Sequence, residues 1–166
     1  LANLIKAFSV FSSQLSDESL PVISQSVSKT RKPKTGEPIS ENGKQITENR
    51  NFKLLLVGNK GWKSDEIYAL PKELGIEKSV RFLDRISDQD LVSLYSNAAA
   101  LPYPSLFEGF GLPILEAFAC GCPVITSNSS SMPEIAGNAA LLVDAVNEAE
   151  IAEAMVKITK NDVLRN

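Results

Sequence analysis

Two glutamates in one short stretch are the residues best suited to chemistry. Residues 107–118 read FEGFGLPILEAF, so that Glu108 and Glu116 stand on either side of a Gly-Phe-Gly turn. Pro113 follows that turn, and proline suits the first turn of a helix because the N–H that it lacks has no partner there. We therefore expect a helix from Pro113 to Cys120, with Glu116 in or just past its first turn.

The turn ahead of this helix has the features of an anion-binding site. The main-chain N–H groups of Phe110, Gly111 and Leu112 would point out from the helix N-terminus, where the helix dipole favours an anion such as a diphosphate. Gly109 and Gly111 allow a positive φ and let a ligand approach the main chain closely. The sequence therefore predicts that anionic oxygens bind at this turn.

A carboxylate beside an anion site repels that anion unless the carboxylate binds something else. Sugar hydroxyls are a natural partner, because an ionised carboxylate accepts two charge-assisted hydrogen bonds from neighbouring hydroxyls, each worth about 1.5 to 3 kcal/mol. One glutamate could hold a ribose and the other a hexose. The alternative is structural: Glu116 complements the helix N-terminus, and Glu108 is a solvated loop residue.

A run of serines follows at Ser127–Ser131. Their hydroxyls could donate hydrogen bonds to sugar oxygens. They could equally cap the short helical turn that starts just before Glu134. The spacing of these residues does not separate the two roles.

From Phe52 onward, short apolar runs alternate with stretches of helical period. Strands separated by helices of about ten residues imply right-handed crossovers and a parallel sheet. The predicted fold class is α/β, a doubly wound and mostly parallel sheet with helices on both faces. In such a sheet, ligands bind at the carboxyl ends of the strands, and both glutamates fall on that edge. Strands are expected at residues 52–58, 79–83, 98–104, 123–127 and 139–143, and helices at 63–76, 88–97, 113–120, 132–136 and 148–160.

A single domain is expected over residues 1–166. The chain is 43% hydrophobic and 22% charged, which is ordinary for a globular protein with one core. Apolar side chains recur at helical spacing over residues 2–15. Residues 17–51 are rich in polar residues and proline, which predicts a long polar surface insertion within the domain. Because the chain begins at Leu1 without an initiator methionine, we expect it to be internal to a longer protein.

Charge and composition argue against several classes of protein. A net charge of −3 gives no general attraction to nucleic acid or anionic lipid. No apolar run approaches the roughly 20 residues that a membrane span needs. Without histidine, and with only Cys120 and Cys122, the chain lacks the ligands of a zinc site and the cysteines of a disulfide framework. We expect both cysteines to be small buried residues, and any imidazole in the mechanism to come from outside this chain.

The stretch PSLFEGFGLPILEAFACGCPVITSNSSSMPEIAG, Pro104 to Gly137, closely resembles the signature of the retaining glycosyltransferases of family four, which have the GT-B fold. In that family the two glutamates, with seven residues between them, lie in the C-terminal, donor-binding domain. The stretches LLLVGNKGW, VRFLDRISDQDLVSLYSNA and AALLVD also resemble the family, in its order. The resemblance covers Leu1 to Lys160 except the insertion.

The resemblance implies a role for each residue of the site. Glu116 would bind the ribose hydroxyls of the nucleotide, and the catalytic Glu108 would contact the transferred sugar near the anomeric centre. The donor sugar and phosphate would be bound at Gly109, Phe110, Gly111 and Leu112. The main chain around Arg85 and Ile86 would bind the nucleobase, and Gly58 would let its loop pass close to the nucleotide.

The resemblance also implies parts that this chain does not contain. The first strand of the domain, and the loop whose arginine and lysine bind the diphosphate, would precede Leu1. An N-terminal domain of the same polypeptide would bind the acceptor. The donor would be a nucleoside diphosphate sugar, with no cofactor and no metal. The family suggests a cytoplasmic enzyme whose other half touches the membrane, and the isolated chain is expected to be inactive.

Other functions stay open at this point. A sugar-nucleotide-binding module without transfer activity, or a GT-B epimerase or phosphorylase, would have the same residues at this edge of the sheet. A scaffold domain without a ligand is a third class, and it leaves the ordered edge unexplained. Asp84 stands where glycine is common in the family.

Overall fold

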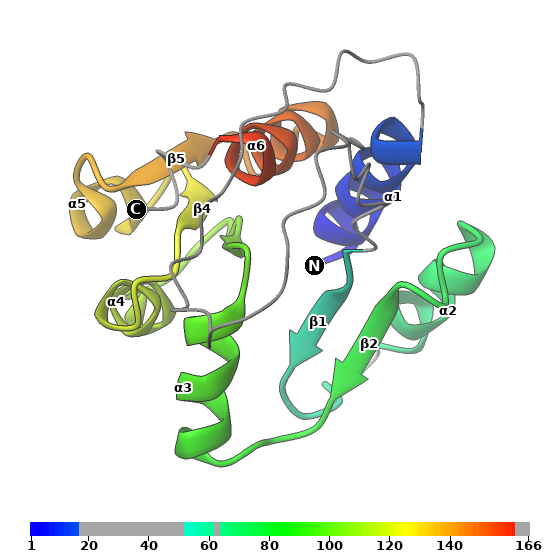
Figure 1. The fold of residues 1–166 in the computed structure, drawn as a ribbon, viewed down its shortest axis with the longest axis horizontal. Coiled ribbons are helices and arrows are strands. Elements are labelled where there is room, and N and C mark those ends of the chain that lie inside the picture. Colours follow the sequence, from blue (N-terminus) through cyan, green and yellow to red (C-terminus); the bar gives the residue numbers. More distant parts are fainter. Residues whose placement is uncertain (17–51, 62–63, 162–166) are drawn as a thin grey trace, which may run out of the picture.

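The computed structural model describes residues 1–16, 52–61 and 64–161, so the predicted insertion at 17–51 lies outside the described residues. Helices and strands alternate along the described chain, which confirms the predicted α/β class (Figure 1). In chain order the elements are α1 (Ala2–Ser16), β1 (Leu54–Val57), α2 (Asp65–Glu73), β2 (Val80–Leu83), α3 (Asp88–Asn97), β3 (Leu101–Tyr103), α4 (Leu112–Ala119), β4 (Val124–Ser127), α5 (Met132–Ala136), β5 (Ala140–Val143) and α6 (Glu148–Lys160).

Helices α3, α5 and α6 begin and end at the residues that the sequence predicts. Side-chain caps explain two of these starts. Ser87 Oγ accepts a hydrogen bond from the N–H of Asp90 in α3, and Asn147 Oδ1 accepts one from the N–H of Glu150 in α6. Such caps satisfy N–H groups that a helix start leaves unpaired. These helix boundaries are therefore local properties of the sequence.

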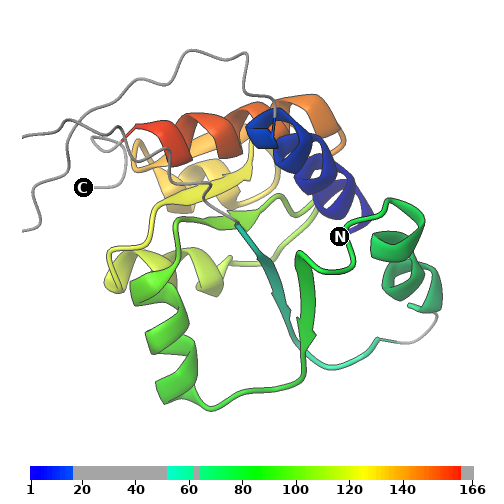
Figure 2. The ribbon, with the colours of Figure 1, turned by 45° about the vertical axis from the view of Figure 1, so that its right-hand side comes forward.

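The strands form two sheets, and within each sheet the strands are parallel. β1 pairs with β2, and β4 lies between β3 and β5. β1 and β3 are not hydrogen-bonded to each other, and the two groups of strands run in different directions (Figure 2). The parallel architecture is as predicted, but the single continuous sheet is divided in two. A further strand ahead of Leu1 stays a prediction.

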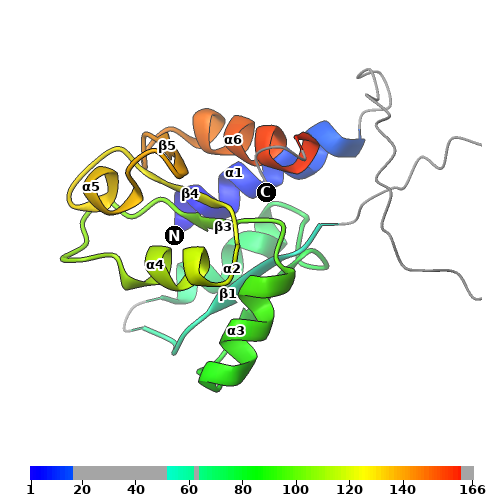
Figure 3. The same cartoon turned by 60° about the vertical axis from the view of Figure 1, so that its left-hand side comes forward.

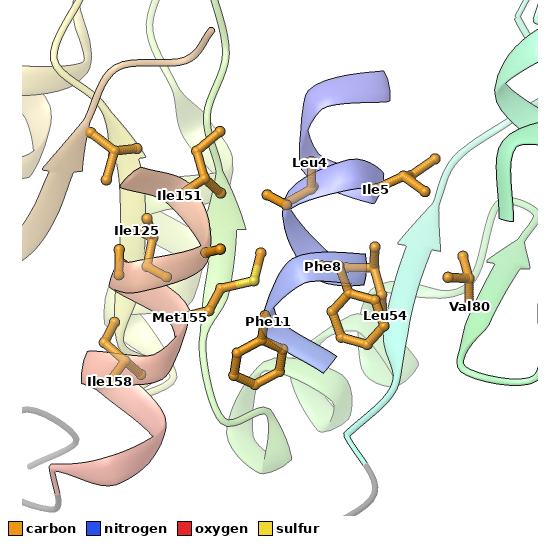
Figure 4. Close-up of a cluster of buried hydrophobic side chains, with 14 residues drawn as sticks. Leu4, Ile5, Phe8, Phe11, Leu54, Val80, Ile125, Ile151, Met155 and Ile158 are labelled. Atoms are coloured by element: carbon orange, nitrogen blue, oxygen red, sulfur yellow. The ribbon is translucent and has the colours of Figure 1, made fainter. Parts of the chain in front are cut away.

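Helix α1 explains how two separate sheets share one core. Its buried side chains lie between α6 on one side and β1 on the other (Figure 4). They are Leu4, Ile5, Ala7, Phe8 and Phe11. Because packed apolar side chains join the sheets, no hydrogen bonds between β1 and β3 are needed to hold them together.

Strand β4 is covered by helices on both faces. All four of its residues are buried, as expected for the centre of a parallel sheet. Helix α6 lies on one side of β4 and α4 on the other (Figure 3). Ile125 packs in the core shared with α1 and α6, whereas its neighbour Val124 packs against α4 and α5. The residues of this second core, which we call the α4 cluster, are Ile114, Ala117, Cys122, Val124 and Met132.

The two cysteines are free thiols at the end of α4 and the loop that follows it. Cys122 is buried in the α4 cluster, whereas Cys120 is only partly buried. Burial raises the pKa of Cys122 to about 11, so its thiol stays protonated and unreactive. The prediction of a small buried residue is confirmed for Cys122.

Candidate functional site

Glu108 lies in the loop that leads from β3 into α4. Its side chain is half-buried, and the phenol O–H of Tyr103, the last residue of β3, donates to Glu108 Oε2 at 2.7 Å. Within the described part of the chain, Oε1 of Glu108 accepts no hydrogen bond. The protein thus holds one carboxylate oxygen and leaves the other available to a ligand.

Serine hydroxyls hold the main chain of the same loop. Ser130 and Ser131 each donate to the carbonyl oxygen of Glu108 at 2.9 Å, and Ser129 donates to the carbonyl of Leu106 at 3.4 Å. The N–H of Glu108 donates in turn to Ser130 Oγ at 3.4 Å. Ser131 is the N-cap residue of α5 but makes no side-chain capping bond. The capping role is therefore wrong: the hydroxyls pair instead with loop groups that no helix or strand satisfies.

Glu116 lies on the exposed side of α4. The phenol O–H of Tyr95, on α3, donates to Glu116 Oε2 at 3.3 Å, a longer contact than that between Tyr103 and Glu108. Its Oε1 likewise accepts no hydrogen bond from the described residues. In both glutamates, therefore, a tyrosine O–H donates to Oε2, and none of the described residues donates to Oε1.

The same apolar cluster supports both tyrosines. Tyr95 and Tyr103 are partly buried against the α4 cluster. Burial, and then the charge and hydrogen bond of the partner glutamate, raise the pKa of each phenol to about 12. The charges of both Glu108 and Glu116 contribute to the raised pKa of Tyr103. Both phenols stay protonated at neutral pH and remain hydrogen-bond donors.

Gly111 stands at the junction between the Glu108 loop and α4. It is the N-cap residue, its φ is 82°, and a Cβ at this position would lie 2.9 Å from Cε of Met132. The backbone conformation therefore favours glycine, and a Cβ would require the end of the flexible Met132 side chain to move. Of the two glycines expected to permit a positive φ, Gly111 adopts one and Gly109 does not.

The main-chain N–H groups at the start of α4 are unpaired. Those of Phe110, Gly111 and Leu112 donate no hydrogen bond to the described part of the chain. The side chains of Phe110 and Leu112 are exposed, as is Gly109. Three consecutive free donors at the positive end of an eight-residue helix can hold the oxygens of an anion.

Gly58, Arg85 and Ile86 lie at the carboxyl ends of the other sheet. The N–H of Gly58 donates to the carbonyl of Leu83 at 2.9 Å, which ties the end of β1 to the end of β2. Arg85 is exposed and Ile86 is half-buried in the loop before α3. Among the described residues, no hydrogen bond or ion pair connects this edge with Glu108 or with Glu116. The structure thus joins the two glutamates and the glycine turn, but not the residues expected to bind the base.

A cavity of about 220 Å³ lies away from both glutamates. It opens at the amino ends of β4 and β5 and contains no charged group, so it does not suit a charged donor. Its lining residues are Pro123, Val124, Asn138, Ala139, Ala140, Leu141 and Ile158.

Metal sites and membrane spans are both absent from the described residues. Over residues 1–16, 52–61 and 64–161, no group of three or more acidic or cysteine side chains could hold a metal ion. In the same ranges, no helix is both long enough and apolar enough to cross a membrane. The expectation that the reaction uses neither metal nor cofactor stays a prediction.

The chain matches one protein family over almost its whole length. Residues 4–166 match the family described as Glycosyl transferases group 1, which is nearly the whole chain. The chain belongs to this family. The family resemblance carried by Pro104 to Gly137 is thereby confirmed.

Relatives of this glycosyltransferase chain are much longer than the chain itself. O-antigen chain mannosyltransferase B of Escherichia coli is 40% identical over 114 residues, which are 69% of this chain and 30% of that protein. D-inositol 3-phosphate glycosyltransferase of Corynebacterium jeikeium (strain K411) is 37% identical over 110 residues, 65% of this chain and 26% of that protein. The chain therefore spans less than a third of the length of either relative.

Solved structures of glycosyltransferases share the fold. Sucrose-phosphate synthase from Thermosynechococcus elongatus has a TM-score of 0.62 and 32% identity, over 68% of this chain and 30% of that one. WaaG, a glycosyltransferase involved in lipopolysaccharide biosynthesis, has a TM-score of 0.61 and 27% identity, over 70% of this chain and 31% of that one. These likenesses confirm the GT-B fold class that the resemblance implied.

Proposed function

We propose that this chain is the donor-binding domain of a retaining glycosyltransferase that transfers a hexose from a nucleoside diphosphate sugar to an acceptor hydroxyl. Family membership supports the reaction class, and the relative that is a mannosyltransferase supports a hexose. One observation carries the proposal. Glu108 and Glu116 each have one oxygen held by a tyrosine and one oxygen free, on either side of unpaired N–H groups.

Each glutamate is assigned a different part of the donor. Glu108, in the loop, contacts the hydroxyls of the transferred sugar and lies near the anomeric carbon. Glu116, on α4, binds the ribose diol. Both contacts use the free Oε1, because an ionised carboxylate oxygen is a strong acceptor for sugar hydroxyls.

The start of α4 is assigned to the diphosphate and the sugar. Transfer breaks the bond between the anomeric carbon and the diphosphate oxygen, and negative charge then grows on the leaving group. The N–H groups of Phe110, Gly111 and Leu112 stabilise that charge, together with the helix dipole. The arginine and lysine expected ahead of Leu1 add to this effect, without a metal.

The rest of the donor and the acceptor lie further from α4. The nucleobase is assigned to the main chain at Arg85 and Ile86, with Gly58 beside the nucleotide. An acceptor-binding domain outside residues 1–166 completes the enzyme, in the cytoplasm and in contact with the membrane through that domain. The chain alone is therefore expected to bind donor without turning it over.

Calorimetry tests the ribose assignment. The natural polypeptide that contains residues 1–166 is titrated with nucleoside diphosphate hexoses, UDP-glucose among them. Glu116→Ala removes a charged acceptor and is expected to weaken binding about tenfold or more. Glu153→Ala is the matched control, because Glu153 is exposed on α6 away from α4, and its affinity should equal that of the wild type.

Four outcomes would each contradict a different part of the proposal. Equal affinity of wild type and Glu116→Ala would remove the ribose role. Multiple-turnover transfer by residues 1–166 alone would show that no second domain is needed. Binding without any transfer by the natural polypeptide would favour a sugar-nucleotide-binding module, and donor conversion without a hydroxyl acceptor would favour an epimerase or a phosphorylase.

A further inference from the structure

Glu108 is held at more points than a loop residue usually is. Its Oε2 accepts from Tyr103, its carbonyl accepts from Ser130 and Ser131, and its N–H donates to Ser130. A glutamate side chain has several rotatable bonds, and holding only its main chain would leave the carboxylate free to turn. The contact with Tyr103, at 2.7 Å, is the one that fixes the carboxylate itself.

Tyr103 is in turn fixed by rigid neighbours. It ends β3 between Pro102 and Pro104, and prolines restrict the backbone on both sides. Its carbonyl accepts a hydrogen bond at 3.0 Å from Oγ1 of Thr126, a fully buried residue of β4. Its ring packs against the α4 cluster. The phenol therefore stands at the end of a strand whose position the core determines.

We infer that Tyr103 is a positioning residue for Glu108: its phenol holds Oε2 so that Oε1 is the oxygen that accepts a hydroxyl of the donor sugar. This inference rests on the function proposed above, in which Glu108 contacts the transferred sugar. Burial, the hydrogen bond from the phenol to Glu108 and the charges of Glu108 and Glu116 raise the pKa of Tyr103 to about 12. The phenol is thus a permanent donor at neutral pH and does not compete as a base.

Tyr103→Phe tests this role because it removes the hydroxyl and keeps the ring that packs against the α4 cluster. Release of nucleoside diphosphate from donor sugars is measured on the natural polypeptide. We expect kcat to fall about tenfold with little change in KM, since a misplaced carboxylate affects the reacting state more than donor binding. Tyr68→Phe is the matched control: Tyr68 stacks on Phe82 at 4.3 Å, far along the chain from the glutamates, and kcat should not change.

A double variant tests whether Tyr103 acts through Glu108. Tyr103→Phe combined with Glu108→Gln should be no slower than Glu108→Gln alone, because the positioned group is already gone. Additive losses would overturn the inference. A Tyr103→Phe enzyme with the same kcat as an active wild type would also overturn the inference. Neither result would count against the proposed function. A wild type that acts on no donor sugar would overturn the proposed function and this inference with it.

A spectroscopic measurement tests the pairing without any turnover. The Tyr103 phenol is titrated by NMR of ring-labelled tyrosine in residues 1–166, with its signal assigned by Tyr103→Phe. In Glu108→Gln the pKa of Tyr103 should fall, because the carboxylate charge and acceptor are lost, while burial keeps it above its ordinary value. An unchanged titration would mean that the phenol does not hold the carboxylate, and would overturn the inference.

Discussion

Glu108 and Glu116 have the same chemistry and the same kind of partner, but different supports. Glu116 is placed by α4 itself, since the helix fixes the position of its main chain and the direction of its Cα–Cβ bond. Glu108 lies in a loop and is held by Tyr103 from β3 and by Ser130 and Ser131 from the turn before α5. Its exposure is also lower than that of Glu116.

The two glutamates also differ in the hydrogen bonds that hold them in place. The carboxylate assigned to the reacting sugar accepts from Tyr103 at 2.7 Å, and side chains of the turn before α5 hold its main chain, whereas the carboxylate assigned to the ribose accepts from Tyr95 at 3.3 Å and its main chain is held by α4. Reaction rates depend on the placement of groups near the reacting carbon more steeply than affinity depends on the placement of a binding group. Substitutions at these residues test whether the two glutamates differ in role.

The largest expected effect is the loss of turnover in Glu108→Gln. Replacing a charged group that contacts the transition state should lower kcat at least about a hundredfold. Glu116→Gln is the matched change on α4, and it should mainly raise KM. Steady-state kinetics of the natural polypeptide separates the two effects. Equal losses of kcat in both variants would mean that the glutamates do not differ in role.

Gly111→Ala should disturb both glutamate sites, because Gly111 joins the loop to the helix. A Cβ there meets Met132 Cε at 2.9 Å, and the φ of 82° disfavours alanine. We expect about 2 kcal/mol or more of destabilisation, measured by chemical denaturation of residues 1–166.

Gly121→Ala separates the two causes of that loss. Gly121 also has a positive φ, of 68°, but a Cβ there would meet nothing within 4 Å. Gly121→Ala should therefore lose only the stability that the backbone conformation costs, about 1 kcal/mol. If both variants lost the same stability, the contact with Met132 would not matter.

The smallest expected effect is on the serines that hold Glu108. Ser130→Ala removes the hydroxyl that pairs with both the carbonyl and the N–H of Glu108, which should lower stability by about 1 kcal/mol. Ser130→Gly should lose less, because Ser130 has a φ of 57° that only glycine adopts without strain. Thermal unfolding of residues 1–166 measures both.

An exposed helical serine provides the control for the Ser130 variants. Ser96 bonds only to the carbonyl of Val92 within α3, so Ser96→Ala should change stability little. If Ser130→Gly were less stable than Ser130→Ala, the conformation at Ser130 would not be strained. Neither Ser130 variant should change the affinity that depends on Glu116.

Several features of the fold could be predicted from local sequence. The predicted bounds of α3 and α6 agree with the structure, and the caps at Ser87 and Asn147 give the local reason for their starts, since capping involves residues three apart. The two glutamates were predicted at the strand edge because strand and helix patterns alternate around them. The matching family confirms the kind of protein that the resemblance of Pro104 to Gly137 implied.

The supports of the site could not be predicted in the same way. Tyr95 is 21 residues from the glutamate it contacts, and Ser130 and Ser131 are 22 and 23 residues from Glu108. The serines were noted as possible caps, but their hydroxyls pair with a loop that the chain folds against them. The division of the strands between two sheets was likewise missed, because it depends on α1 packing between α6 and β1.

By itself, the sequence of this chain determined which residues carry charge, where helices start and which face of each element is apolar. These depend on neighbours within a few positions, where propensity and spacing act directly. Only the tertiary structure decided that the serines meet Glu108, that Tyr95 meets Glu116, and that α1 connects two sheets. Such contacts form between segments far apart in the chain, so they exist only once apolar burial has brought those segments together.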